Sequence, residues 1–377
     1  MKILYLSNAI FESENASLVQ VLSMCKAMSE LGNEVILSIP SLYYKTDNKI
    51  IDIYNYKILL RKGENRFGKF KKYLDRQAIR SVVNTIKPDL IYLREPLLLS
   101  QISNLYIPII MELHNNKLHL GYNFLNNYWK YYVIKNTKNS RIKLIVTISN
   151  ALTNFWVKEG IPKEKIITEH DCVDTELYKN ELSKKEAREI LKIDSNRPII
   201  TYLGRIYKNR RIDDIVKLSK IFNEINFYVV GGPNERAEFY SKLANKENIN
   251  NLTFVGQVPH EKTPLYLYAS DILLALWSKD VPTINYCSPL KIFEYMASGR
   301  IIIAYNFPTI GEVLKNNETA LLVEPESING LAEAINYALN NDLSNLSRNA
   351  RKEAFKNYSW YDRAHRILNK YYTINKE

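Results

Sequence analysis

One segment of the chain combines the residue types of an anion-binding helix start with a carboxylate one turn further on. This segment is Ser288–Gly299, with the sequence Ser-Pro-Leu-Lys-Ile-Phe-Glu-Tyr-Met-Ala-Ser-Gly. Because Ser is a good N-cap and Pro289 fits the first helical position, we expect a helix to start at this pair. Free amides near Leu290 and the charge of Lys291 would attract an anion, and Glu294 could accept hydrogen bonds from a ribose diol. The spacing fits equally well a capped helix with a solvated Lys291–Glu294 ion pair.

A second segment places arginines after an apolar run. The run ends at Gly204, where the backbone can approach a ligand closely. Arg205 follows directly, and Arg210 lies five residues further on. Two guanidinium groups there could hold a diphosphate and offset the charge that builds on it as a leaving group. The alternative is an exposed basic loop, which is our interpretation of Lys208 and Arg211.

In the first half of the chain, His114 follows another apolar run. A histidine at the end of a strand can donate or accept a hydrogen bond at a sugar hydroxyl near neutral pH, although a lone histidine is more often structural. The loop after the first apolar run is polar and could face an acceptor through Asn8, Ser13 and Asn15. It lacks the glycine pair that would favour a phosphate contact.

Short apolar runs alternate with longer segments of helical periodicity, which is typical of an α/β fold with parallel sheets. The runs are Lys2–Leu6, Glu34–Ile39, Tyr56–Leu60, Asp89–Leu93, Pro108–Glu112, Leu144–Ile148, Ile166–Glu169, Pro198–Leu203, Phe227–Val230, Leu252–Val255, Ile272–Leu276, Ile301–Ala304 and Ala320–Val323. Helical periodicity over Val19–Leu31 ends at Gly32, and a last helix is predicted over Tyr358–Tyr372.

The polar stretch Thr175–Arg197 is interpreted as the link between two domains, residues 1–175 and 176–357. Two open parallel sheets would place their ligand sites in the cleft between these domains. Neither domain contains the glycine-rich fingerprint of a dehydrogenase or the phosphate loop of a P-loop kinase.

The composition, with 46% hydrophobic and 24% charged residues, is that of a soluble globular protein, and no apolar run has the ~18–20 residues of a membrane span. Cys25, Cys172 and Cys287 lie far apart, so we interpret them as reduced cytosolic thiols and expect a cytoplasmic protein. The net charge of +12 predicts an anionic partner: nucleotide phosphates, a lipid surface or nucleic acid. Nucleic acid is the weakest of these, because the chain has no zinc spacing or RNA-binding aromatic signature.

Together these segments resemble the retaining glycosyltransferases of the GT-B fold, of the family 4 type (glycosyl transferases group 1). Ser288–Gly299 resembles the donor-site helix of that family. Gly204-Arg205 with Arg210 resembles its diphosphate loop, and Glu112-Leu-His114 its first-domain histidine strand. Matching segments follow one another in the family's order over nearly the whole chain.

The resemblance implies two Rossmann-like domains that face a cleft: an acceptor-side domain over 1–175, joined by a crossover helix over 358–377, and a nucleotide-sugar domain over 176–357. It implies a nucleotide-diphosphate sugar as donor, retention of anomeric configuration, and neither metal nor cofactor. The implied catalytic residues are His114, Arg205, Arg210 and Glu294. The implied donor-binding residues are Gly204, Gly256, Val258, Tyr286, Ser288, Pro289, Leu290 and Lys291.

The sequence departs from the family pattern at a glutamate that usually precedes Glu294 by eight positions, where Tyr286 stands. Cys172 replaces a usual glycine, and Arg210 replaces the commoner lysine. We expect transfer of a sugar to a glycan or lipid-linked acceptor, in assembly of a bacterial surface polysaccharide. A non-catalytic nucleotide-sugar-binding or scaffold subunit is one alternative, which Tyr286 leaves open. A sugar-nucleotide epimerase of the same fold is the other.

Two basic segments of the first half, Arg61–Arg80 and Asn127–Lys143, could contact an anionic membrane. The second mixes lysines with Trp129, Tyr131 and Tyr132, which suits a membrane interface. On this interpretation the protein is peripheral on the inner face of the plasma membrane, where it reaches a lipid-linked sugar. An ordinary solvated basic face explains the same residues.

Overall fold

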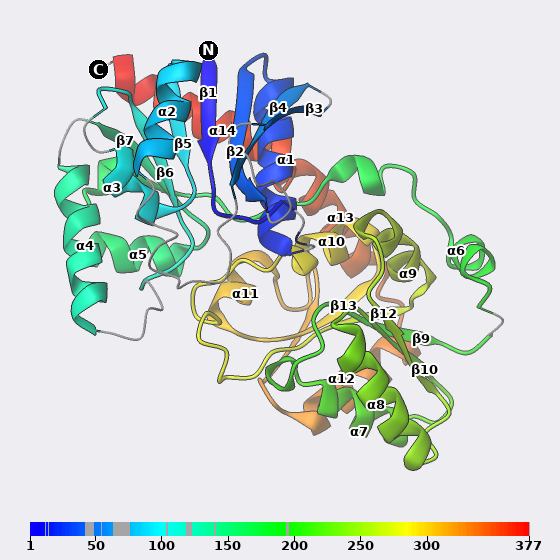
Figure 1. Cartoon of the computed structure of the whole chain (residues 1–377). Coiled ribbons are helices and arrows are strands. Elements are labelled where there is room, and N and C mark those ends of the chain that lie inside the picture. Colours follow the sequence, from blue (N-terminus) through cyan, green and yellow to red (C-terminus); the bar gives the residue numbers. More distant parts are fainter. Residues whose placement is uncertain are drawn as a thin grey trace. The chain divides into compact units, whose positions relative to one another are not determined.

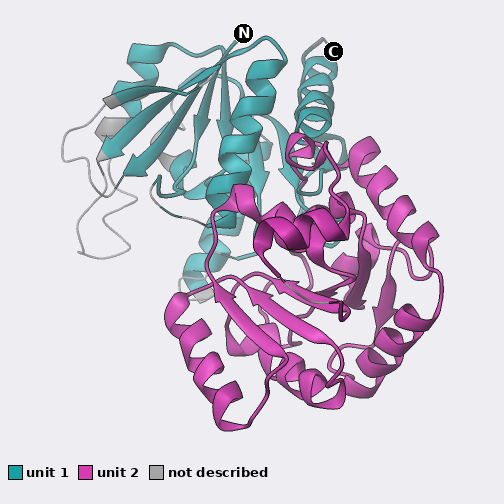
Figure 2. Ribbon diagram, turned by 90° about the vertical axis from the view of Figure 1, so that its right-hand side faces the viewer, with its two compact units in different colours: residues 1–171, 360–377 teal, residues 172–359 magenta. Residues whose placement is uncertain are grey.

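The computed structural model of the chain forms two compact units, each built on a mainly parallel sheet (Figures 1 and 2). It describes residues 1–11, 13, 15–41, 49–53, 55–62, 76–102, 105–117, 123–138, 141–193 and 196–376. Unit 1 comprises Met1–Asp171 and Trp360–Glu377, and unit 2 comprises Cys172–Ser359. The first boundary lies four residues before the predicted limit at 175.

The sheet of unit 1 has the strand order β3-β4-β2-β1-β5-β6-β7-β8. Its strands are β1 (Lys2–Leu6), β2 (Glu34–Ser41), β3 (Lys49–Ile53), β4 (Tyr56–Lys62), β5 (Leu90–Leu93), β6 (Ile109–Leu113), β7 (Ile142–Thr147) and β8 (Ile166–Thr168). All neighbours are parallel except β3, which pairs antiparallel with β4 as an edge hairpin and was not predicted. The order reverses between β1 and β5, and this switch point places the residues after these strands, Ser7 and Arg94, side by side.

Helices cover both faces of this sheet, as its buried apolar central strands require. They are α1 (Ala16–Glu30), α2 (Arg76–Ile86), α3 (Leu99–Ile102), α4 (Asn123–Thr137), α5 (Asn150–Lys158) and α14 (Trp360–Lys376), with the 3-10 turns η2 (Pro96–Leu98) and η3 (Lys163–Lys165). Although α14 is last in sequence, it packs on α1 and β7 and so belongs to unit 1 (Figure 1). It begins at Trp360 rather than at the predicted Tyr358, because Ser359 pairs in a bridge with Val173.

The sheet of unit 2 is wholly parallel, in the order β11-β10-β9-β12-β13-β14. Its strands are β9 (Ile199–Leu203), β10 (Asn226–Val230), β11 (Leu252–Gly256), β12 (Ile272–Ala275), β13 (Ile301–Tyr305) and β14 (Leu321–Val323). The strand order reverses between β9 and β12. In open α/β sheets this switch point, at the carboxyl ends of the strands, is where ligands bind.

The helices of unit 2 include one that the sequence analysis had taken as a linker. They are α6 (Lys184–Leu191), α7 (Ile212–Ile221), α8 (Asn234–Lys246), α9 (Thr263–Ala269), α10 (Leu290–Ser298), α11 (Pro308–Val313), α12 (Ile328–Asn340) and α13 (Ser344–Asn357), with the turns η4 (Thr175–Tyr178), η5 (Lys208–Arg210) and η6 (His260–Lys262). Helix α6 lies within the predicted link but packs on α9. Its Lys184 and Arg188 both pair with Asp271, so the link interpretation is wrong for this stretch.

Helix α10 begins at Leu290, one residue after Pro289, which was predicted as its first helical position. Pro289 occupies the N-cap position with extended backbone, and no side-chain hydrogen bond caps the helix there. Ser288 therefore does not act as the N-cap, because the cap position falls one residue after it. Gly299 ends the helix at a φ of +65°, as the sequence predicted. Among the described residues, no helix is both long and apolar enough to cross a bilayer.

Candidate functional site

At the switch point of unit 2, two glycines allow adjacent backbone segments to meet. Gly204 follows β9 with a φ of +140°, and a Cβ there would lie 2.7 Å from Nζ of Lys291. Gly231 follows β10 with a φ of +136°, and its Cβ would lie 1.9 Å from the carbonyl oxygen of Gly204. Both positions exclude any larger residue. The carboxyl ends of β9 and β10 thus present closely packed backbone.

The side-chain amine of Lys291, in the first turn of α10, lies among aromatic rings. Its Nζ lies 4.0 Å from the ring centre of Tyr202 and 5.0 Å from that of Trp277. The amine is covered from solvent and has no hydrogen-bond partner among the described residues. Burial, with the nearby Arg210 guanidinium, holds the pKa of Lys291 well below its usual range. An anion bound here would supply the missing partner and favour the charged amine.

Glu294 lies one turn further along α10 and is 8% exposed. Its Oε1 accepts a hydrogen bond from Nε2 of His260 at 2.7 Å. The interpretation of Lys291 and Glu294 as a solvated surface pair is therefore wrong, since Glu294 is buried and pairs with a histidine. Sequence reasoning did not select His260, although it stands two positions after Val258, in the loop already assigned to the donor.

The two arginines expected at the diphosphate differ in their surroundings. Arg205 is exposed just after β9, and its carbonyl oxygen accepts a hydrogen bond from the Tyr202 hydroxyl at 3.1 Å. Arg210 is half-buried at the end of η5, where its charge acts on Lys291 and Tyr202. Unit 2 thus gathers the cationic side chains of Arg210 and Lys291 at one end of its sheet.

Lys208 is exposed, as expected, but the same expectation fails for Arg211. The Arg211 side chain forms an ion pair with the buried Asp214, with Nε 2.6 Å from Oδ2. Tyr305 also donates to this carboxylate, at 2.9 Å. Arg211 is therefore a structural residue, fixed because a buried carboxylate requires a partner.

The remaining donor-side predictions lie near the same sheet ends. Tyr286 is buried, which raises the pKa of its hydroxyl. Gly256 ends β11 at a φ of +82°, and its carbonyl oxygen accepts a hydrogen bond from Gly231 N at 2.8 Å. Val258 is half-buried against the core of unit 2, and Ser288 is buried.

In unit 1, the buried carboxylate of Glu112 organises the end of β6. Its hydrogen-bond partners are Gln20 Nε2 at 2.5 Å, His114 Nε2 at 2.7 Å, Arg363 Nη2 at 3.0 Å and the Tyr92 hydroxyl. Glu112 and Arg363 are both 0% exposed, and the guanidinium lowers the pKa of Glu112 despite burial. The sequence analysis did not select Arg363. It could have been recognised as a charged residue on the otherwise apolar face of α14.

His114 is brought to this cluster and is held neutral. Burial and the charge of Arg94 lower its pKa to about 4, although the bond to Glu112 opposes the shift. Gln20 contacts the same Nε2 at 3.3 Å and also accepts a hydrogen bond from Arg94 Nε. At neutral pH His114 can therefore take part in hydrogen bonds but does not change its charge.

The three residues expected to face an acceptor differ in their contacts. Asn8 accepts a hydrogen bond from Arg61 Nη2 at 3.2 Å, and its own Nδ2 is covered, with no partner among the described residues. The Ser13 hydroxyl donates a hydrogen bond within the loop, to the carbonyl oxygen of Ile10 at 2.7 Å. Asn15 is the N-cap residue of α1, without a side-chain capping bond. Of these three residues, Asn8 alone has a buried donor group that forms no hydrogen bond with a described residue.

Of the predicted basic segments, most of Arg61–Arg80 lies outside the described residues, and Arg61 itself bonds to the loop after β1. On α4, Trp129 was predicted to face a membrane, but it is buried and packs against the ring of Trp156. The exposed aromatics are Phe124, Tyr128 and Tyr131, at 68%, 67% and 60%.

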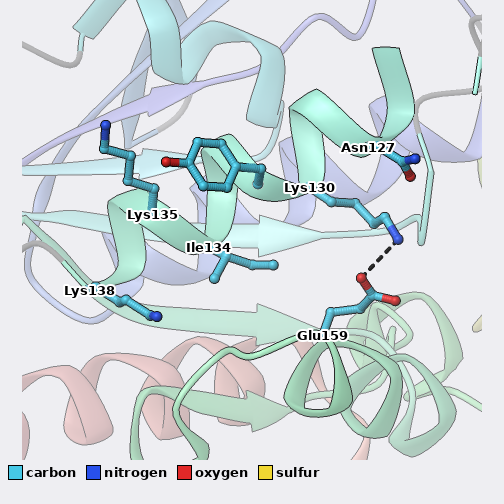
Figure 3. A pocket seen from close by; sticks show the side chains of 7 residues that line it. Asn127, Lys130, Ile134, Lys135, Lys138 and Glu159 are labelled. Atoms are coloured by element: carbon cyan, nitrogen blue, oxygen red, sulfur yellow. Dashed lines mark hydrogen bonds and ion pairs between the residues drawn. The ribbon is translucent and has the colours of Figure 1, made fainter. Parts of the chain in front are cut away.

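A shallow groove of about 510 Å³ lies along the same helix (Figure 3). It is lined by Asn127, Lys130, Tyr131, Ile134, Lys135, Lys138 and Glu159, and Lys130 reaches Glu159 at 2.8 Å. Among the described residues, no group of His, Cys, Asp and Glu side chains could hold a metal ion.

Comparison with known families matches both halves of the chain. Residues 19–177 match Glycosyltransferase Family 4, and residues 183–357 match Glycosyl transferases group 1. Alpha-galactosylglucosyldiacylglycerol synthase of Streptococcus pneumoniae is 25% identical over 57% of this chain and 58% of its own length. D-inositol 3-phosphate glycosyltransferase of Rhodococcus jostii is 27% identical over 49% of this chain and 42% of its own. The matches thus span about half the length of these relatives.

Solved structures share the fold over the full chain. Sucrose-phosphate synthase from Thermosynechococcus elongatus has a TM-score of 0.79 at 18% identity, covering 100% of this chain and 99% of that one. Anabaena Alr3699/HepE, in complex with UDP and glucose, has a TM-score of 0.74 at 16% identity, covering 98% of both chains. Both units thus have the architecture of these proteins.

Proposed function

Since this chain belongs to the family 4 glycosyltransferases of the GT-B fold, we propose that it transfers a sugar from a nucleotide-diphosphate donor to an acceptor hydroxyl. The observation that supports this most directly is Lys291 at the switch point of unit 2, a buried amine that has no hydrogen-bond partner among the described residues. An uncompensated buried cation is costly unless a ligand pairs with it. Glu294, one turn along the same helix, adds an acceptor for the ribose.

In the proposed reaction, the diphosphate binds beside Arg205, Arg210 and Lys291 and to the free amides of α10. Negative charge grows on the diphosphate as the bond to the sugar breaks, and preorganised cations stabilise that charge. These side chains take the place of a divalent metal, so the proposed transfer is metal-independent. We propose that it retains the anomeric configuration, as the family resemblance implies.

The neutral imidazole of His114 is assigned to a hydroxyl of the transferred sugar. Glu112 and Gln20 hold the ring in one orientation, so that it does not need to reorganise during the reaction. Because the pKa of His114 is about 4, it is assigned a hydrogen-bonding role rather than a proton-transfer role at neutral pH.

The relatives do not agree on one acceptor. One is named for a diacylglycerol glycolipid and the other for an inositol 3-phosphate. We propose a lipid-linked or glycan acceptor, as in surface polysaccharide assembly, on the strength of α4. Its exposed Tyr131 lines the same groove as Lys130, Lys135 and Lys138 (Figure 3). Aromatic rings with flanking lysines suit the interface of an anionic membrane.

The test is transfer from labelled UDP-glucose, GDP-mannose and ADP-glucose to a lipid or glycan extract, without added metal. We expect one donor to yield a labelled product of the same anomeric configuration as the donor, and Arg205→Ala to reduce its rate more than tenfold. An epimerised nucleotide sugar formed without acceptor would instead indicate an epimerase. Binding without turnover of any donor would favour a non-catalytic subunit.

A further inference from the structure

His260 connects the loop after β11 to the carboxylate on α10. It is the first residue of η6, and its Nε2 lies 2.7 Å from Oε1 of Glu294. The Glu294 side chain is 10% exposed and that of His260 is 34% exposed. The carboxylate assigned to the donor ribose is therefore held by a second residue that reaches solvent.

The backbone of His260 is fixed by the helix that follows it. Thr263, the first residue of α9, donates its hydroxyl hydrogen to the His260 carbonyl oxygen at 2.7 Å. The backbone N–H of Lys262 donates a hydrogen bond to the carbonyl oxygen of Pro259 at 2.9 Å and closes the turn that contains His260. Because α9 also packs on α10, both ends of the His260–Glu294 bond are anchored to the same helix pair. The imidazole thus limits the rotamers of Glu294.

The charges around His260 favour its protonated form. The hydrogen bond to Glu294 is the largest influence and raises the pKa of His260, with smaller contributions from Glu261 and Asp174, while burial opposes them. Lys291, also on α10, interacts with Glu294 rather than with the imidazole. Nδ1 of His260 makes no hydrogen bond to the described residues. A protonated ring would therefore carry a second N–H group, at Nδ1.

We propose that His260 is a positioning residue for donor binding: it occupies Oε1 of Glu294 and keeps Oε2 turned toward the ribose diol. This inference rests on the proposed function. A carboxylate fixed before binding loses less conformational entropy when the ligand arrives. Since the ribose is remote from the bond that breaks, His260 acts on affinity for the nucleotide and not on the chemical step.

The test is calorimetric titration of His260→Ala and His260→Gln with whichever of UDP-glucose, GDP-mannose and ADP-glucose binds the wild type. These sugar diphosphates do not titrate near neutral pH, so the ligand adds no pH dependence. His260→Ala should weaken binding about tenfold, the loss expected for a hydrogen bond to a charged group. His260→Gln keeps an N–H donor and should recover most of the affinity. His365→Gln, on the exposed face of α14, is the matched control and should match the wild type.

The pH profile separates positioning from a merely structural role. The pKa of His260 is raised, so its charge is present below that pKa and is lost as pH rises through it. Wild-type affinity should therefore fall as pH rises above ~6.5, and His260→Gln should reduce this fall. In turnover, His260→Ala should raise KM and leave kcat within about twofold.

Unchanged or tighter binding by His260→Ala would overturn the inference while leaving the proposed function intact. A pH profile that stays the same in His260→Gln would overturn it as well. If the wild type bound none of the three donors, the proposed function itself would fail, and the inference with it. If His260→Ala did not fold, the His260→Gln titration and its pH profile would still decide the question.

Discussion

Two histidines of this chain each lie 2.7 Å from a glutamate, yet their pKa values move in opposite directions. The pKa of His260 rises because the bond to Glu294 outweighs partial burial. That of His114 falls to about 4 because burial and Arg94 dominate. Glu112 cannot compensate, since it already pairs with Arg363. The protonation of each ring depends on its burial and on the charges that surround it in space, and neither can be read from the sequence.

Replacing the amine of Lys291 should affect thermal stability and nucleotide binding in opposite directions. Lys291→Met removes a desolvated cation but keeps much of the apolar stem between Tyr202 and Trp277. We expect the melting temperature to stay the same or to rise, because the substitution removes a buried amine that no described residue hydrogen-bonds. Nucleotide binding should fall more than tenfold, because the diphosphate loses a charge-assisted partner.

Thermal unfolding and titration calorimetry on the same preparation measure both effects. Lys208→Met, an exposed lysine on η5, is the control and should change neither. Lower thermal stability together with unchanged binding would show that Lys291 serves the fold rather than a ligand.

The residue types of the site could be predicted from sequence, but their partners could not. The motif at Ser288–Gly299 located Lys291 and Glu294 correctly on one helix. It could not show that Glu294 binds His260, because that contact depends on how α9 packs on α10. The ion pair of Arg211 could not be predicted for the same reason, because Asp214 is buried by the packing of unit 2.

At the scale of elements, the buried parallel strands were the most predictable part of the fold, because both faces must be apolar. The edge strand β3 was missed, since an edge strand buries less and its polar residues hide the pattern. Helix α6 was mistaken for a linker because its surface is charged, although Arg188 is anchored on Asp271.

Helix α14 is joined to β6 by the buried pair of Arg363 and Glu112. Arg363→Met would leave the carboxylate buried without its cation, which costs about 3–5 kcal/mol of unfolding free energy. Urea unfolding would measure this loss. Arg366→Met, on the next turn, breaks a pair with Glu169 that is partly exposed and should cost at most about 1 kcal/mol. Equal losses for the two variants would contradict the assignment.

The same pair implies a pH dependence. The folded pKa of Glu112 is lowered, so its contribution to stability is present above the unfolded pKa and is lost as pH falls through the folded pKa. Wild-type stability should therefore decline on acidification, and Glu112→Gln should reduce the slope of that decline.

At the scale of the whole molecule, the net charge of +12 favours contact with anionic surfaces, and we propose α4, with its exposed aromatic residues, as the face that docks. Each lysine near an anionic membrane contributes about 1 kcal/mol. We expect the protein to float with liposomes that contain phosphatidylglycerol, and to be released by salt. Pure phosphatidylcholine liposomes should leave it unbound.

A triple variant, Phe124→Ser with Tyr128→Ser and Tyr131→Ser, should reduce flotation severalfold. A variant with Phe239→Ser and Tyr337→Ser, two exposed aromatics of unit 2, is the control and should float like the wild type. Flotation that did not depend on anionic lipid, or equal loss in both variants, would exclude docking through α4.

On the proposed function, unit 2 binds a nucleotide diphosphate through α10. The most direct measurement is calorimetric titration of the wild type and Glu294→Ala with UDP, GDP and ADP, without metal. We predict that the wild type binds one of them and that Glu294→Ala weakens this binding at least tenfold, or about 1.4 kcal/mol, with the fold unchanged. Equal affinity in the variant, or no binding of any nucleotide by the wild type, would contradict the claim.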